Sequence, residues 1–108
     1  MFEYFRENYV WNLALMSAIH AGGAITEIDD ACRPLKEASG RNDALAQQAW
    51  YESWKKVAER VEALARAHEE AGQYLSAGRK YVRAGIYFET AALEANHRSR
   101  LATEPTTP

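Results

Sequence analysis

The stretch that decides the fold is AQQAWYESWKKVAERVEALARAHEEA, residues 46–71. Its apolar side chains recur every three or four residues, which is the spacing of one face of an α-helix. Opposite charges stand four residues apart on the remaining surface, and this pattern indicates a face in contact with water. We therefore predict one long amphipathic helix. Its apolar face comprises Ala46, Trp50, Trp54, Val57, Val61, Leu64 and Ala71, and its charge pairs are Glu52–Lys56, Lys55–Glu59 and Glu62–Arg66.

Gly72 interrupts this pattern, and a second amphipathic stretch follows over residues 74–96. A short turn centred on glycine makes two long helices antiparallel neighbours, so a helical hairpin is predicted. Small side chains would let the two backbones approach closely. The small residues are Ala77, Gly78, Ala84 and Gly85, and the expected apolar face comprises Tyr74, Ala77 or Gly78, Tyr81, Ala84, Phe88, and Ala91 or Ala92.

Two shorter helices are predicted ahead of the hairpin. The first covers residues 3–21 and ends at Gly22 and Gly23, because glycine adopts the left-handed conformation at a helix end without steric cost. The second begins near Thr26, a candidate N-cap, and ends or bends at Pro34. The side chains expected to face inward in this second helix are Ile28, Ala31 and Cys32.

These elements predict an all-α fold, with two shorter N-terminal helices followed by a long antiparallel helical hairpin. The helical domain is expected to span residues 1–97, and residues 98–108 form a polar tail or linker with two prolines. Residues 37–43 have the composition of a loop, in which Asn42 or Asp43 would cap the third helix. The 108 residues suit a single domain.

Charge and composition exclude several classes of function. The chain has 13 basic and 15 acidic residues, a net charge of -2, whereas a nucleic-acid-binding protein usually carries a basic excess. The most apolar stretch, residues 10–19, is shorter than the ~20 residues that cross a bilayer. Cys32 is the only cysteine, so no internal disulfide can form. We expect a cytoplasmic protein that binds neither nucleic acid nor membranes.

Catalytic motifs are missing from the sequence. No serine lies in G-x-S-x-G, and no glycine-rich stretch is followed by the Lys-Ser/Thr of a phosphate-binding loop. His20, His68 and His97 lie on different segments, and apart from ordinary acids near His68 and His97 none has a second ligand three or four residues away, as a metal site requires. We therefore expect no catalytic residue, no cofactor and no metal in this chain.

Aromatic residues are frequent for so short a helical chain, and two interpretations apply. They pack as the core, or they form an apolar wall over a ligand or a second domain. Met16 and His20 lie one turn apart on the first helix and could join such a wall, although a histidine near a helix C-terminus often serves to balance the helix dipole. The candidate substrate-binding residues are Trp11, Met16, His20, Trp54 and Tyr87.

Three stretches of the sequence carry a resemblance to a known family. HAGGAITEI (residues 20–28) resembles a G-G-A-x-x-E segment, and WYESW with AER (residues 50–60) resembles W-x-x-x-W…A-x-R. AGQYLSA (residues 71–77) and YVRAGIYF (residues 81–88) resemble A-G-H-x-x-S-A…Y-x-R-A-A-x-Y-Y. The family is the alpha/beta-hydrolase subfamily that contains 2,6-dihydroxypseudooxynicotine hydrolase and fungal polyketide C–C hydrolases. Gln73, Gly85 and Phe88 depart from its pattern.

The resemblance, which covers residues 10–92, implies a helical lid region packed over a catalytic domain. Its parent would be a serine-type hydrolase that cleaves a C–C or ester bond next to a carbonyl, with the catalytic residues later in the chain. The implied partners are a catalytic alpha/beta-hydrolase domain in cis or trans, a small apolar or aromatic ketone or ester substrate, and a second copy in a homodimer. The alternative is a non-enzymatic helical-hairpin interaction module similar to a tetratricopeptide unit, although no second copy appears at a period of ~34 residues.

Overall fold

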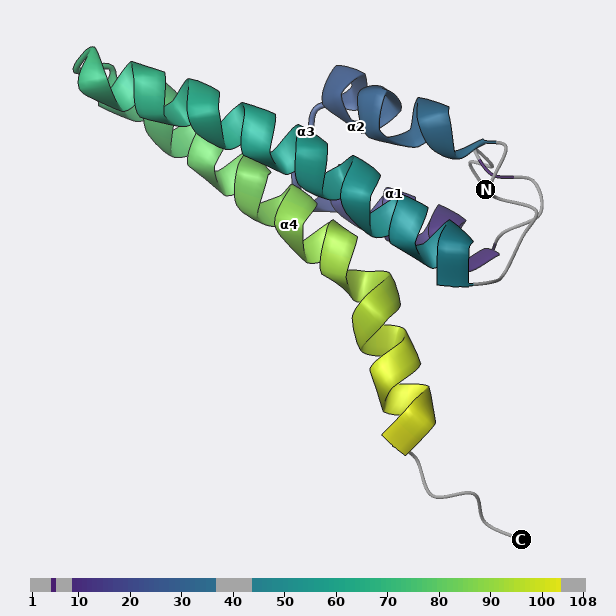
Figure 1. Cartoon of the computed structure of the whole chain (residues 1–108). Helices are drawn as coiled ribbons and strands as arrows, with labels where there is room; N and C mark the ends of the chain where they lie inside the picture. The colour runs from purple at the N-terminus through teal and green to yellow at the C-terminus, as the bar shows by residue number, and fades with distance from the viewer. Residues whose placement is uncertain (1–4, 6–8, 37–43, 104–108) are drawn as a thin grey trace, which may run out of the picture.

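The computed structural model describes residue 5, residues 9–36 and residues 44–103, apart from the side chains of residues 9, 10, 20 and 94–103. These residues form four α-helices, and the all-α prediction is confirmed (Figure 1). The helices are α1 (Tyr9–Ala21), α2 (Ile25–Cys32), α3 (Ala44–Glu70) and α4 (Tyr74–Thr103), and a 3-10 turn, η1 (Arg33–Leu35), follows α2.

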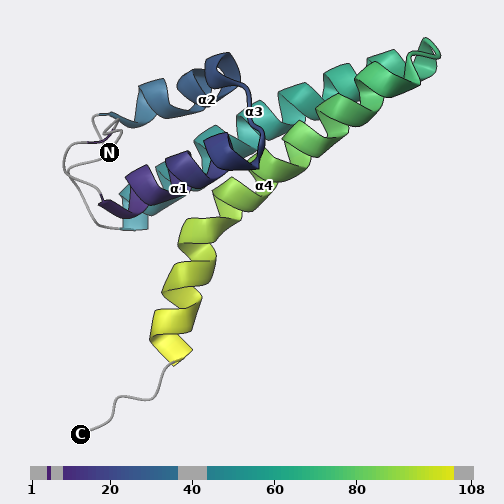
Figure 2. The ribbon, with the colours of Figure 1, turned by 180° about the vertical axis from the view of Figure 1, so that it is seen from behind.

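The long helices α3 and α4 form the predicted antiparallel hairpin, which is the frame of the molecule (Figures 1 and 2). Gly72 makes the turn with a φ of 78°, a left-handed conformation that glycine adopts without steric cost. The backbone N–H of Gln73 donates to the carbonyl of His68 at 2.8 Å and closes the end of α3. The helix α4 continues past Asn96 to Thr103, so part of the predicted tail is helical.

The short helices cover only the half of the hairpin that lies away from its turn. α1 contacts α4, α2 contacts α3, and the half near Gly72 projects beyond both (Figures 1 and 2). Gly22 ends α1 with a φ of 114°, as predicted, and the chain then reverses into α2. The molecule is consequently elongated, with extents of 58 × 29 × 25 Å.

A row of aromatic rings forms the centre of the core, where α1, α3 and α4 meet. The ring centroids of Trp11 and Trp50 are 4.9 Å apart, those of Trp50 and Trp54 5.5 Å, and those of Trp54 and Tyr87 5.9 Å. Phe5 packs edge-on against Trp11 at 5.2 Å. Its backbone N–H donates to the side-chain oxygen of the buried Asn12 at 2.8 Å, which explains a polar residue within the apolar stretch of α1.

The predicted apolar face of α3 is confirmed away from the turn and wrong near it. Ala46, Trp50, Trp54, Val57 and Val61 are buried. Leu64, by contrast, is 47% exposed, and Ala71 lies beyond the helix and is exposed. Near the turn α3 has only α4 as a neighbour, so burial is limited to positions such as Ala65.

The apolar face of α4 also differs from the prediction. Ala77, Ala84 and Ala91 are buried, but Tyr74 is 72% exposed, and the buried Tyr87 takes the central place. Gly78 and Gly85 point away from α3, since a Cβ added at either would meet nothing within 4 Å. The expectation that these two glycines bring the helices together is wrong, and of the four small residues only Ala77 and Ala84 are buried.

Smaller predictions have mixed outcomes. Ile28, Ala31 and Cys32 are buried as expected, but the N-cap of α2 is Ala24, with no side-chain cap, and Thr26 lies within the helix. Of the charge pairs, Glu62–Arg66 forms at 3.2 Å. Residues 1–4, 6–8, 37–43 and 104–108, with the proposed caps Asn42 and Asp43, lie outside the described residues. Across the described helices, none combines the length and apolar character needed to cross a bilayer.

Trp50 is fully buried, and its indole N–H donates to the carbonyl of Thr90 at 2.9 Å. We predict that Trp50→Ala lowers the free energy of unfolding by about 3 kcal/mol, because it removes a large apolar side chain and leaves a cavity. Urea denaturation followed by circular dichroism measures the change. The matched control, Leu45→Ala in the first turns of α3 at a 68% exposed position, should change it by less than about 0.5 kcal/mol. A loss below about 1 kcal/mol for Trp50→Ala would contradict the core assignment.

Candidate functional site

The predicted substrate-binding residues lie in and beside the aromatic core. Trp11 is 1% exposed, and Trp54 and Tyr87 are fully buried, so core packing is what the structure shows for these three side chains. Met16 is half-buried on α1, and His20 lies in the last turn of α1 with its side chain outside the described part. Direct contact of these residues with a substrate stays a prediction.

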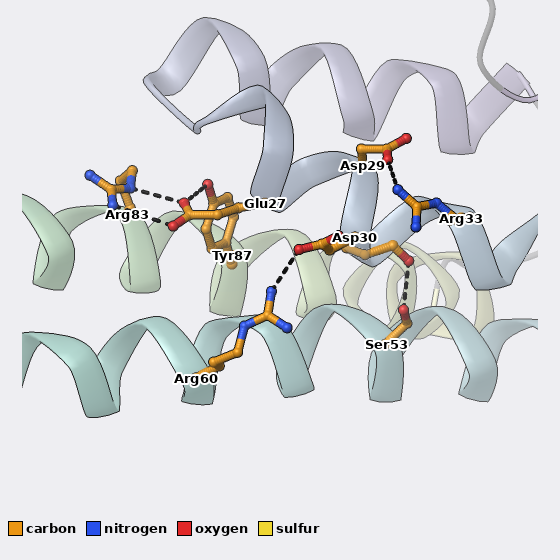
Figure 3. A network of polar contacts seen from close by, with 9 residues as sticks. Glu27, Asp29, Asp30, Arg33, Ser53, Arg60, Arg83 and Tyr87 are labelled. Carbon is orange, nitrogen blue, oxygen red and sulfur yellow. Dashed lines mark hydrogen bonds and ion pairs between the residues drawn. The ribbon is translucent and has the colours of Figure 1, made fainter.

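A polar cluster joins the start of α2 to the middle of α4, beside this aromatic row (Figure 3). The Glu27 carboxylate accepts hydrogen bonds from Arg83 Nε at 2.9 Å and from Arg83 Nη2 at 3.3 Å. Tyr87 donates its hydroxyl to Glu27 Oε1 at 2.6 Å, and the same hydroxyl accepts the backbone N–H of Ala24 at 2.8 Å. We call these four residues the Glu27 cluster.

The electrostatics of the Glu27 cluster favour the ionised carboxylate. Burial acts to raise the pKa of Glu27, but the hydrogen bonds from Arg83 and Tyr87 and the charge of Arg83 outweigh it, so the pKa lies below its ordinary value. Burial and the hydrogen bond to Glu27 raise the pKa of Tyr87, which keeps its phenol protonated as a donor. The bidentate arginine–carboxylate geometry also fixes the orientation of both groups.

Gly23 is required for the cluster to form, because the turn between α1 and α2 passes very close to Tyr87. A Cβ added at Gly23 would lie 2.9 Å from Ile28 Cδ1, 3.0 Å from the Ala18 carbonyl oxygen and 3.1 Å from Tyr87 Cε1. Only glycine lets the backbone approach the phenol ring this closely. The Gly-Gly pair therefore ends α1 and also brings Ala24 and Glu27 to α4.

Two further contacts fasten α2 to α3 (Figure 3). Arg60 Nη2 lies 2.9 Å from Asp30 Oδ2, and the Ser53 hydroxyl donates to the carbonyl of Ala31 at 2.6 Å. Within α2 and η1, Asp29 pairs with Arg33. Polar contacts to both helices of the hairpin thus hold α2 in one position against them.

The arrangement is suited to holding elements together rather than to bond-breaking chemistry. Burial, with a smaller contribution from Asp29, raises the pKa of the Cys32 thiol to about 12, so it stays protonated and is a poor nucleophile. Ser53 donates to the α2 backbone and, among the side chains that the structure describes, has no histidine as a hydrogen-bond partner. In the described ranges, no group of three or more His, Cys, Asp or Glu side chains converges to hold a metal ion.

Comparison of the chain with protein-family models, with curated proteins and with solved structures finds no match. The structure itself brings together the three stretches that carry the resemblance. Gly23 and Glu27 come from the first stretch, Trp54 from the second, and Arg83 and Tyr87 from the third; the Trp54 and Tyr87 rings are in contact.

Sequence reasoning missed Glu27 and Arg83 as partners. Arg83 and Tyr87 stand four residues apart and so share one face of α4, which is a signal that the sequence contains. Their acceptor is 56 residues from Arg83 in the chain, and several other acids could have served. Helical periodicity and charge spacing do not select Glu27 among them; the signal that could have done so is its place at the end of the G-G-A-x-x-E segment.

Glu27→Gln tests the charge of the cluster. At pH 7 we expect the free energy of unfolding to fall by about 1–3 kcal/mol, because a charge-assisted pair in a half-buried site is lost. The folded pKa of Glu27 is depressed, so its contribution is present above the unfolded value of about 4.3 and is lost as the pH falls through the folded pKa. Urea titrations of both proteins from pH 7 to pH 3 should therefore converge in acid. A constant difference across this range would contradict the assignment.

Gly23→Ala tests the close approach. We expect it to destabilise the fold by about 1–3 kcal/mol, because the new methyl group overlaps the Ala18 carbonyl and the Tyr87 ring. Gly85→Ala is the matched control: it lies within α4 in open space and should stabilise by about 0.5–1 kcal/mol. Thermal melts of the two variants should shift in opposite directions, and equal shifts would contradict the role given to Gly23.

Proposed function

We propose that the chain is the helical lid and substrate-binding segment of an alpha/beta hydrolase that cleaves a C–C or ester bond next to a carbonyl. The observation that carries this proposal is the Glu27 cluster. The first and third stretches that resemble the hydrolase subfamily lie far apart in the chain. They are in contact through Gly23 and Glu27 of the first stretch and Arg83 and Tyr87 of the third. Sequence stretches that define one family fold are expected to contact each other in that fold.

The role of such a segment is to exclude water from a catalytic site and to orient the substrate. A rigid cover suits that role, and here α1 and α2 are fixed to the hairpin by an aromatic core and by polar contacts on both sides. The nucleophile, its base and the oxyanion hole would belong to the catalytic domain, which this proposal places outside the 108 residues.

Exposed apolar side chains on the short helices are consistent with a covered position in the whole enzyme. Leu13 of α1 is 43% exposed, and Ile25, at the start of α2, is 73% exposed. In this proposal Met16 and His20 contact the substrate, a small apolar or aromatic ketone or ester. Trp11, Trp54 and Tyr87 then form the wall behind them.

A second candidate function is a helical interaction module that works without a catalytic domain. The observation in its favour is the hairpin half near Gly72, which α1 and α2 leave uncovered (Figures 1 and 2). Large apolar side chains are exposed there, with Tyr74 at 72% and Leu75 at 71%. Projecting apolar helix faces of this kind are common at protein–protein contacts.

The intact mass of the protein from its native source distinguishes the two functions. A mass several-fold above 12.2 kDa, in a chain whose serine is labelled by a fluorophosphonate probe, is the result expected for a hydrolase lid. A separate labelled chain that co-purifies in a fixed ratio would place the catalytic domain in trans and also supports the proposal. A mass of 12.2 kDa with no labelled serine in the purified material would overturn it in favour of the interaction module.

A further inference from the structure

The helix α4 is bent, although it contains no proline. Its last part, drawn yellow, leaves the line of the hairpin, whereas the part that packs on α3 follows that line (Figures 1 and 2). Sharp bends in helices arise at prolines, at pairs of glycine and serine, at π-bulges, or where a side chain enters the ladder of backbone hydrogen bonds. Residues 74–103 are α-helical throughout, and their last glycine is Gly85. A side chain that enters the ladder is therefore the cause to look for.

Two hydrogen bonds at Thr90 supply this cause. The indole N–H of Trp50 donates to the Thr90 carbonyl at 2.9 Å. In a regular helix this carbonyl accepts only the N–H four residues later, so a second donor draws the carbonyl away from the helix axis and weakens that bond. The Thr90 hydroxyl donates to the Ile86 carbonyl at 2.8 Å, and this kind of contact also bends helices. The backbone of α4 is therefore weakened at Thr90.

The indole that binds the Thr90 carbonyl is itself held in place from the side of α1. The ring centroid of Trp50 lies 4.9 Å from that of Trp11 in α1 and 6.1 Å from that of Phe5. Trp50 is fully buried, so its ring has no room to move unless these neighbours move. A displacement of α1 would shift the indole, and the Thr90 carbonyl would then lose its second donor. The contacts Trp11–Trp50 and Trp50–Thr90 thus connect α1 to the bend in α4.

We propose that Thr90 is a hinge in α4, and that residues 91–103 form an arm whose direction is set by the Trp50–Thr90 hydrogen bond. With α1 in place the bond is made, and the arm points away from the line of the hairpin. When α1 is displaced, the Thr90 carbonyl returns to its bond within α4, and the arm swings toward that line. The aromatic core is then a conformational switch that converts the position of α1 into the direction of the arm.

Two nitroxide labels on α4 measure the bend by double electron–electron resonance. They are attached to the full 108-residue chain through Leu75→Cys, at a 71% exposed position in the first turn of α4, and Arg100→Cys, in the arm. Cys32→Ala leaves only these two cysteines to react. In a straight helix the two backbone positions would be about 38 Å apart, at 1.5 Å of rise per residue. The labelled parent should give a shorter distance, because α4 is bent.

Four substitutions in this labelled parent test the hinge. Trp50→Phe keeps an aromatic ring and removes the N–H, so the distance should lengthen by at least about 3 Å toward the straight-helix value. Trp54→Phe is the matched control: Trp54 is fully buried one turn away, and within the described part of the chain its indole N–H has no hydrogen-bond partner, so the distance should not change. Thr90→Val removes only the hydroxyl and should lengthen the distance by less. Trp11→Leu loosens the contact with α1 and should broaden the distribution toward longer distances.

Circular dichroism shows whether each variant is folded, and Thr90→Val tests the hinge with the aromatic core intact if Trp50→Phe does not fold. Three outcomes would overturn the proposal. They are a parent distance equal to the straight-helix value, a distance that neither Trp50→Phe nor Thr90→Val lengthens relative to Trp54→Phe, and a distribution that Trp11→Leu leaves unchanged. None of these outcomes bears on the mass of the native protein or on its labelled serine, so this inference and the proposed function fail independently.

Discussion

The indole of Trp50 is the contact on which the rest of the structure depends. It lies on α3, packs at a tilt against the rings of Trp11 of α1 and of Trp54, and donates its N–H to the Thr90 carbonyl of α4. The Trp50 side chain therefore links α1, α3 and α4. Its ring is a large apolar group, and its N–H donates a hydrogen bond in one fixed direction. The apolar part supplies the burial, and the donor fixes the lengthwise position of α4 relative to α3. Without this hydrogen bond, α3 and α4, which face each other mainly through alanines, could slide lengthwise past each other.

The Glu27 cluster fixes the position of α2, as Trp50 fixes the position of α4 relative to α3. An eight-residue helix is too short to be stable alone, so its position must come from its neighbours. Apolar burial of Ile28, Ala31 and Cys32 supplies the attraction, while polar contacts to α3 and α4 fix where α2 lies along the hairpin. The order in the chain matters: the Gly-Gly turn allows the close approach to Tyr87, and that approach places Ala24 and Glu27 within reach of its hydroxyl.

Local patterns in the sequence predicted the helices, the hairpin and the turn at Gly72, because the spacing of apolar residues and the positions of glycines are properties of short stretches. They did not predict how far the short helices extend along the hairpin, and for that reason Leu64 and Tyr74 were expected to be buried and are exposed. An amphipathic pattern shows which face is apolar and not whether a neighbour covers it. The pairing of Glu27 with Arg83 was not predicted for a different reason: it depends on the packing of two segments far apart in the chain.

The uneven cover of the hairpin has a consequence for its motions. Away from the turn, three aromatic-bearing helices share one core, whereas near Gly72 the two long helices meet mainly through Ala65 and Ala77, which bury little area. The free energy needed to open backbone hydrogen bonds should therefore decline steadily along the hairpin toward the turn. Amide hydrogens of the last turns of α3 and the first turns of α4 would exchange with solvent through local fraying, while those around Trp50 and Tyr87 would exchange only when the whole chain unfolds.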